Sequence, residues 1–212
     1  MMNLRPCFLT RFLRDRRGVA AIEAAIYLPA LLAILLGFFD LYHFLMITQR
    51  IERTAASTAD LVARNPGGTS GLTNNNSLTN TTDIATFFAA AQQLAYPITD
   101  LTSAGRVIIT YVTNVSGTPT IQWQCFGPYK TVNTNLSSQI GSTGGTPTLP
   151  TGLPMGVGDG TIAVEVYYAF NPFSISKGFV SSSLSSPTTI YKRFFYRPRL
   201  LGVIAMTPAP PC

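Results

Sequence analysis

An unbroken apolar run dominates the amino-terminal part of the chain. From Val19 to Phe39 there are 21 residues with one charged side chain, Glu23, among them. An α-helix rises about 1.5 Å per residue, so this run would extend roughly 30 Å, the thickness of a bilayer core. The pattern therefore predicts a membrane-spanning helix. A charged side chain facing lipid at the bilayer centre would cost roughly 2.5 to 3.5 kcal/mol, so Glu23 is a candidate functional residue.

The helical pattern continues beyond the apolar run. Between Asp40 and Arg64 there is no Gly or Pro, apolar or small residues recur at spacings of three and four, and Asp60 can pair with Arg64. One helix of about 45 residues is therefore predicted, ended by a Pro-Gly-Gly sequence. Pro29 removes one of its backbone hydrogen bonds and is expected to kink it near Ala25.

A loop and a second helix are predicted next. The stretch at 66–82 is rich in Gly, Ser, Thr and Asn, which is typical of an exposed linker; a receptor-binding or glycosylated loop is the alternative. A helix is predicted to begin at Thr82 or Asp83 and to end before Pro97. Its apolar stripe consists of Ile84, Phe87, Phe88, Ala91 and Leu94.

Alternation with a period of two predicts a sheet in the remaining chain. Strands are expected at 106–115, 120–126, 161–170 and 189–196, the last with an extension past Pro198 to Met206. In the second strand, Ile121, Trp123 and Cys125 alternate against Gln122 and Gln124. The helical stripes need an apolar partner, so the expected fold class is α+β, with the helices packed on a small antiparallel sheet.

Positive charge is concentrated before the apolar run. Five Arg and one Asp precede Val19, giving +4, whereas the rest of the chain carries +2 of the net +6. By the positive-inside rule this bias places the amino terminus in the cytoplasm and the carboxy-terminal bulk across the membrane. This topology accounts for the basic cluster, so the cluster does not indicate nucleic-acid binding. A cleaved secretory signal is the alternative, but the apolar run is longer than the 7 to 15 residues or so of a signal peptide's apolar region.

The spacing of four residues is more specific. Gly18 closes the basic segment, and Glu23, Pro29 and Asp40 follow it in order. This arrangement resembles the prepilin processing site, and more narrowly the TadE-like minor pseudopilins of tight-adherence (Flp, type IVb) pilus systems. The likeness covers residues 16–64. Related major pilins carry a tyrosine directly after the glutamate, where this chain has Ala24, and that departure favours a minor pseudopilin over the filament subunit.

The resemblance implies a processed, non-enzymatic assembly component with a pilin-like fold. A prepilin peptidase would cut after Gly18, so the expected division is a cleaved leader at 1–18, a spanning helix with its extension at 19–64, and an extracytoplasmic domain at 65–212. Its implied location is the bacterial inner membrane, as a single-pass protein, with entry into a pilus left open. The implied partners are the lipid bilayer, the prepilin peptidase, other pseudopilins, a Flp-type pilin and inner-membrane platform proteins.

Glu23 has two open interpretations. Cleavage would give Val19 a positive α-amino group, and the carboxylate of Glu23 from the same or a neighbouring subunit could neutralise it. Alternatively, the helix dipole and interfacial water would stabilise Glu23 without a partner. The function likewise has an alternative: an uncleaved bitopic membrane protein with an extracytoplasmic binding or adhesin domain.

Few other residues suggest chemistry. No nucleophile, base and orienting group occur together, so we expect neither an enzyme nor a metal or cofactor site. The lone His43 is interpreted as an interfacial helix residue. The glycine-rich segment 156–160 precedes a strand and is predicted to be a turn. Four basic residues alternate with aromatic ones near the last strand, either as a basic face or as a site for an acidic surface: Lys192, Arg193, Arg197 and Arg199.

The three cysteines divide by predicted compartment. Cys7 would lie in the reducing cytoplasm, whereas Cys125 and Cys212 would lie outside, where disulfides persist. We predict that Cys125 and Cys212 pair, which would tie the last residue to the sheet. Two free thiols are the alternative.

Overall fold

The computed structural model describes residues 17–64, 77–79, 83–127, 136–173, 186–198 and 205–207. Its helices are α2 (Arg17–Arg64), α3 (Asp83–Leu94) and α4 (Leu101–Ala104). Its strands are β1 (Ser77–Thr79), β2 (Gly105–Thr113), β3 (Thr120–Gly127), β4 (Gly160–Phe170), β5 (Thr188–Tyr196) and β6 (Ala205–Thr207). The chain divides into two compact units, Met1–His43 with Phe173–Ser185, and Phe44–Pro172 with Ser186–Cys212.

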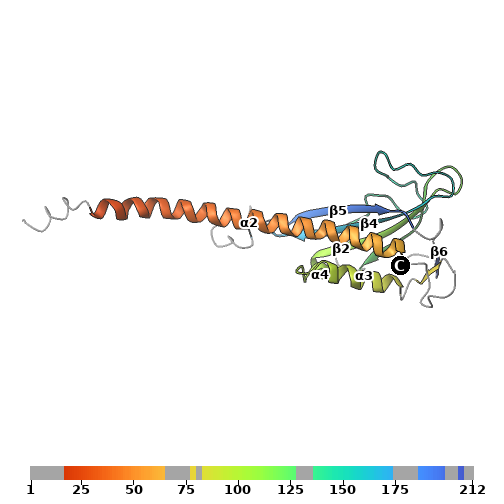
Figure 1. Ribbon diagram of the computed structural model, residues 1–212, viewed down its shortest axis with the longest axis horizontal. Coiled ribbons are helices and arrows are strands. Elements are labelled where there is room, and N and C mark those ends of the chain that lie inside the picture. Colours follow the sequence, from red (N-terminus) through yellow and green to blue (C-terminus); the bar gives the residue numbers. More distant parts are fainter. Residues whose placement is uncertain are drawn as a thin grey trace, which may run out of the picture. The chain divides into compact units, whose positions relative to one another are not determined.

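The expected α+β class is confirmed. Helix α2 continues through Pro29 to Arg64 without a break. In the second unit, β3, β2, β4 and β5 lie in that order in one antiparallel sheet, and α3 is the further helix (Figure 1). The described residues add the one-turn helix α4 and a two-stranded parallel sheet of β1 and β6. The division into leader, spanning helix and globular domain stays a prediction.

Helices cover one face of the four-stranded sheet. From Phe44 onward, α2 buries a stripe at spacings of three and four, and α3 adds its own stripe. Both stripes pack against side chains of the sheet in one core. The α2 stripe consists of Ile47, Ile51, Ala55, Ala59 and Val62. The two alanines allow a close approach of helix to sheet. The predicted α3 stripe is confirmed except at Leu94, which is exposed because the chain turns there and buries Ala95 instead.

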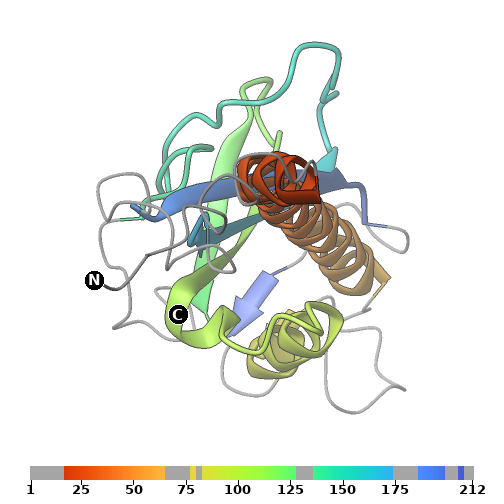
Figure 2. The same cartoon turned by 90° about the vertical axis from the view of Figure 1, so that its left-hand side faces the viewer.

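The other face of the sheet is also covered. All nine residues of β2 are buried, which requires cover on both sides. The segment 136–159, between β3 and β4, supplies it: Ile140 packs with Val112 of β2, Ile121 of β3 and Ala163 of β4 in a second, smaller core. Figure 2 shows this teal segment on the side of the sheet away from α3. The sheet is thus the middle of three layers.

The predicted alternation in β3 is wrong at one position. Trp123 pairs with Tyr111 and Ile121 with Val112, so Gln122 is an extra residue, a β-bulge. The bulge turns Ile121 to the face opposite Trp123 and Cys125, which lie in the core beneath the helices. Gln124 is buried, not exposed, and its Nε2 donates to Thr110 Oγ1 at 2.8 Å.

The predicted extension of the last strand is also wrong. β5 ends at Tyr196, because Pro198 has no N–H for a ladder. The residues Ala205–Thr207 instead form β6, which pairs in parallel with β1. Strand β1 in turn lies within 66–82, where the sequence predicts only a loop. A short turn joins β2 to β3, and Gly117 within it has φ 92°, a conformation that favours glycine.

Gly127 tests the packing of α3 on β3. A Cβ at this position would lie 2.4 Å from two ring atoms of Phe88, so Phe88 would have to move. We expect Gly127→Ala to lower the free energy of unfolding by about 1 to 3 kcal/mol, as overpacking does. Fluorescence of Trp123, the only tryptophan, reports the unfolding of the full chain in detergent. The control is Gly156→Ala, where the nearest atom is 3.6 Å away. Equal stability of the two variants would contradict this packing.

Candidate functional site

The apolar part of α2 in the first unit is the first candidate site. The described residues contain one helix long and apolar enough to cross a membrane, Gly18–Arg64, and none of the residues in its most apolar window is buried. Exposure reaches 67% at Ile26 and 74% at Ile34. Apolar patches of this extent on a protein surface mark contact with a membrane or another protein. The helix therefore makes the chain a candidate single-pass membrane protein.

Gly18, Val19 and Glu23 lie together at the start of this exposed helix. All three are exposed, and a Cβ added to Gly18 would meet nothing within 4 Å. Glu23 follows Val19 by four residues, so the two side chains share one face of the helix, about 6 Å apart along its axis. The structure thus brings together the residues of the predicted processing site and the predicted charge pair. Pro29 lies within the same helix, and its kink stays a prediction.

Asp40 and His43 mark the end of the apolar run. Asp40 is only 7% exposed, whereas its neighbours Phe39 and Leu41 are about half exposed. His43 is half-buried, and the described part of the chain holds no group of three or more His, Cys, Asp or Glu side chains placed to bind a metal. The interpretation of His43 as an interfacial residue stays a prediction.

A buried carboxylate in the second unit is not among the residues that the sequence pattern singled out. Glu165 of β4 is fully buried on the sheet face away from the helices. Its Oε1 accepts from the Gln139 amide at 2.9 Å and the Tyr191 hydroxyl at 2.8 Å, and Ser138 Oγ donates to Oε2. These bonds fasten residues 138–139 to the sheet. The only signal in the sequence was a charge inside the apolar strand 161–170.

Two tyrosines beside Glu165 hold their protons strongly. Burial raises the pKa of Tyr167 to about 12, and the negative charge of Glu165 adds to this effect. Burial also raises the pKa of Tyr191, and the hydrogen bond from its hydroxyl to Glu165 raises that pKa further. The Tyr167 hydroxyl donates to the Ser137 carbonyl at 2.8 Å. Arg106, over the ring of Phe126, donates from Nη1 to the Leu136 carbonyl, and burial lowers its pKa. The network connects strands to the covering segment and has no visible catalytic arrangement.

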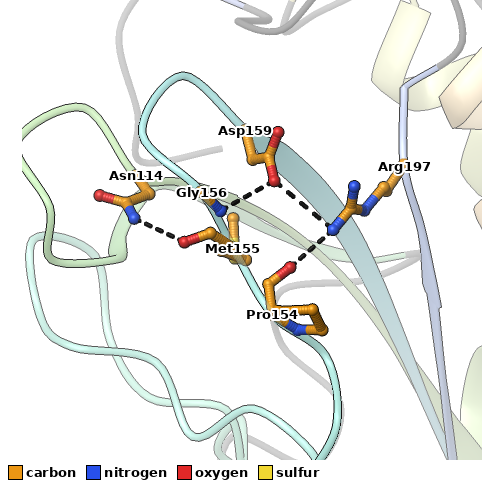
Figure 3. A network of polar contacts seen from close by, with 6 residues as sticks. All are labelled: Asn114, Pro154, Met155, Gly156, Asp159 and Arg197. Carbon is orange, nitrogen blue, oxygen red and sulfur yellow. Dashed lines mark hydrogen bonds and ion pairs between the residues drawn. The ribbon is translucent and has the colours of Figure 1, made fainter.

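A second polar network fixes the turn before β4 (Figure 3). Gly156 donates its amide to Asp159 Oδ2 at 2.9 Å, and Arg197 contacts the same carboxylate oxygen at 3.4 Å. Arg197 also donates to the Pro154 carbonyl at 2.6 Å, and Asn114 Nδ2 to the Met155 carbonyl at 2.8 Å. The glycine-rich segment 156–160 is therefore a structural turn, as predicted.

The basic residues near the last strand are largely occupied within the second unit. Lys192 pairs with Glu52 of α2 at 3.1 Å, and Arg193 lies over the ring of Phe195. Arg197 belongs to the turn network, and Arg199 lies outside the described residues. The aromatic residues point to both faces of the sheet, since Phe194 packs on the helix side and Phe195 on the other.

Cys125 is buried in the core beneath the helices and is disulfide-bonded. Cys7 and Cys212 lie outside the described residues. The pairing of Cys125 with Cys212 therefore stays a prediction.

One comparison with known proteins gives a match. Residues 18–60 match the family model TadE, described as TadE-like protein. This confirms the resemblance noted from the spacing of Gly18, Glu23, Pro29 and Asp40, all of which lie inside the matched segment. No curated protein and no solved structure matches the chain.

Leu31 tests the exposed helix as a membrane span. It lies near the middle of the apolar run and is 65% exposed. We expect Leu31→Arg to shift a large share of the full chain from the membrane pellet to the supernatant in alkaline carbonate extraction, because a central arginine costs roughly 2.5 to 3.5 kcal/mol. The control is Leu61→Arg in the same helix, at an exposed position beyond the apolar run. Equal extraction of both variants would contradict the span.

Tyr167 tests the buried network by its pH dependence. Its pKa in the folded chain lies above 10.0, so its stabilising effect is complete below about pH 10 and is lost as the pH rises toward 12. Between about pH 10 and pH 12, we expect the free energy of unfolding to fall less steeply with pH in Tyr167→Phe than in the wild type. Trp123 fluorescence in nonionic detergent measures the unfolding. Tyr96→Phe, at an exposed tyrosine, should leave the wild-type slope unchanged. If Tyr167→Phe kept the wild-type dependence of unfolding free energy on pH, Tyr167 would not be the source of this effect.

Proposed function

We propose that this chain, which carries a TadE-like segment at residues 18–60, is a minor pseudopilin of a tight-adherence, type IVb pilus system. The observation that carries the proposal is that the matched segment coincides with the exposed apolar helix. Gly18, Val19 and Glu23 stand at its start and Pro29 inside it. In this role the protein is a non-enzymatic assembly component.

Processing is the first step of the proposed mechanism. A prepilin peptidase hydrolyses the peptide bond after Gly18, and the basic leader 1–18 leaves. Val19 then carries a free α-amino group, which is protonated near neutral pH. The exposure of Gly18 and Val19 on the helix supports access by a membrane peptidase. The arginines of the leader keep this end of the chain in the cytoplasm, so the second unit is exported.

Charge pairing is the second step. The new ammonium group of Val19 and the carboxylate of Glu23 lie one helical turn apart within a subunit, and either group is costly when buried alone in a bilayer. Pairing them offsets that cost, whether the two groups belong to one subunit or to neighbours. Pairing between neighbours also fixes the axial position of one helix against the other. Small residues on either side of Glu23 allow such helices to approach closely: Ala20, Ala21, Ala24 and Ala25.

The remaining α2 residues link this anchor to the second unit. The proposed partners are the peptidase, other pseudopilins and a Flp-type pilin, the inner-membrane platform proteins and the bilayer. In this scheme the Cys125–Cys212 bridge would stabilise the exported unit.

The mature amino terminus tests this proposal. We expect mass spectrometry of membrane fractions to give a chain starting at Val19 in cells with the prepilin peptidase and an uncleaved chain without it. Gly18→Val should abolish the cut, whereas Gly37→Ala, at the other glycine of the described helix, should not. In cleaved protein, Glu23→Ala should lower pilus assembly at least tenfold, and Asp60→Ala should leave it near wild type.

Two results would contradict the proposal. A peptidase-independent start at Met1 or Met2 would favour the uncleaved bitopic protein with a binding or adhesin domain. A start near Asp40 would indicate a secreted protein released by signal peptidase. Normal assembly with Glu23→Ala would remove the charge pair from the mechanism while leaving the processing intact.

A further inference from the structure

The two edges of the four-stranded sheet differ. At the β3 edge, the Ile121 amide donates to the Gly145 carbonyl at 3.0 Å, and the Ile121 carbonyl accepts from the Gly144 amide at 2.8 Å. These bonds block the addition of another strand there. At the β5 edge, no backbone hydrogen bond from a loop or turn of the described chain reaches Thr188–Tyr196. An edge of this kind presents backbone donors and acceptors to any extended chain that lies beside it.

A hollow flanks β5 on the helix side. It has a volume of about 310 Å³ and is lined by Gln49, Glu52, Arg53 and Ala56 of α2 and by Phe194 of β5. Phe194 packs against the main core, and Ala56 is too small to fill the space above it. The ion pair of Lys192 with Glu52 joins strand and helix beside the hollow. A helix on one side and a strand edge on the other form the type of groove in which added strands bind.

The positive charge of Arg53, which lines the hollow, favours an acidic binding partner. Glu52 is paired with Lys192, whereas Arg53 is exposed and makes no ion pair with a described residue. An acidic side chain is the complement of the Arg53 guanidinium, which lines the hollow together with Ala56 and Phe194. The edge strands of a second copy do not supply it, because neither β3 nor β5 contains Asp or Glu. Two β5 strands would also bring Lys192 and Arg193 of each copy together.

We propose that an extended acidic segment of another polypeptide binds the groove between α2 and β5. The segment adds as a strand to the outer edge of β5, places an apolar side chain in the hollow beside Phe194, and sets an Asp or Glu against Arg53. The proposal uses residues of the second unit alone and does not depend on processing at Gly18.

Site-specific photocrosslinking in intact cells tests this interface. A photoreactive amino acid at Gln49 of the full chain should form an adduct with another polypeptide, and the same residue at the exposed Gln93 of α3 should not. Arg53→Glu should lower the adduct yield at least tenfold, Arg53→Lys should retain most of it, and Ala56→Trp, which fills the hollow, should abolish it. Trp123 fluorescence confirms that the Arg53 variants are folded.

The captured peptide decides the outcome. Sequencing should find an acidic residue within two positions of an apolar one, and its substitution by Lys should restore crosslinking to Arg53→Glu. The proposal is overturned by an adduct with a second copy or with lipid alone, by no adduct, or by a yield that Arg53→Glu leaves unchanged. Failure of peptidase-dependent cleavage would refute the pseudopilin and leave this result intact.

Discussion

The uninterrupted helical backbone of α2 is the constraint on which the rest of the structure depends. One helix of 48 residues serves two environments, so its side-chain pattern has to change while its backbone does not. From Val19 to Phe39 it is apolar on all sides except at Glu23, as is typical of a helix in contact with lipid. From Ile47 it narrows to a stripe, because only one face meets the sheet. Asp40, buried among exposed apolar neighbours, lies where the first pattern gives way to the second.

The sheet depends on a second covering layer. Helices protect one face, and the irregular segment 136–159 protects the other. An irregular segment has no regular ladder, so its backbone groups need other partners when they approach a sheet. The carboxylate of Glu165 supplies one of these, and the carbonyls of Leu136 and Ser137 meet Arg106 and Tyr167. A charge in the middle of a strand therefore has a structural purpose.

Periodicity predicted the elements well, and tertiary contacts explain what it missed. Helix α2, helix α3 and four strands follow from spacings of three to four and of two. The bulge at Gln122 could not be predicted from the alternation of apolar and polar residues. One extra residue leaves that alternation intact in the sequence but moves Ile121 to the opposite face of the sheet. Two partners of Glu165, Ser138 and Gln139, lie 27 and 26 residues away in a segment without a pattern of its own. At the amino terminus, the spacing of Gly18, Glu23 and Pro29 could be read directly from the sequence, because the three residues lie on one helix.

The pairing of β1 with β6 has a consequence for the order in which the chain folds. Ser77 pairs with Ala205, so more than half of the chain lies between the two strands. The four-stranded sheet is different, because β2 and β3 are joined by a short turn. A chain synthesised from its amino terminus can form that hairpin early, whereas β1 must wait until β6 has been synthesised. This parallel pair closes a long loop late, and such non-local contacts form slowly.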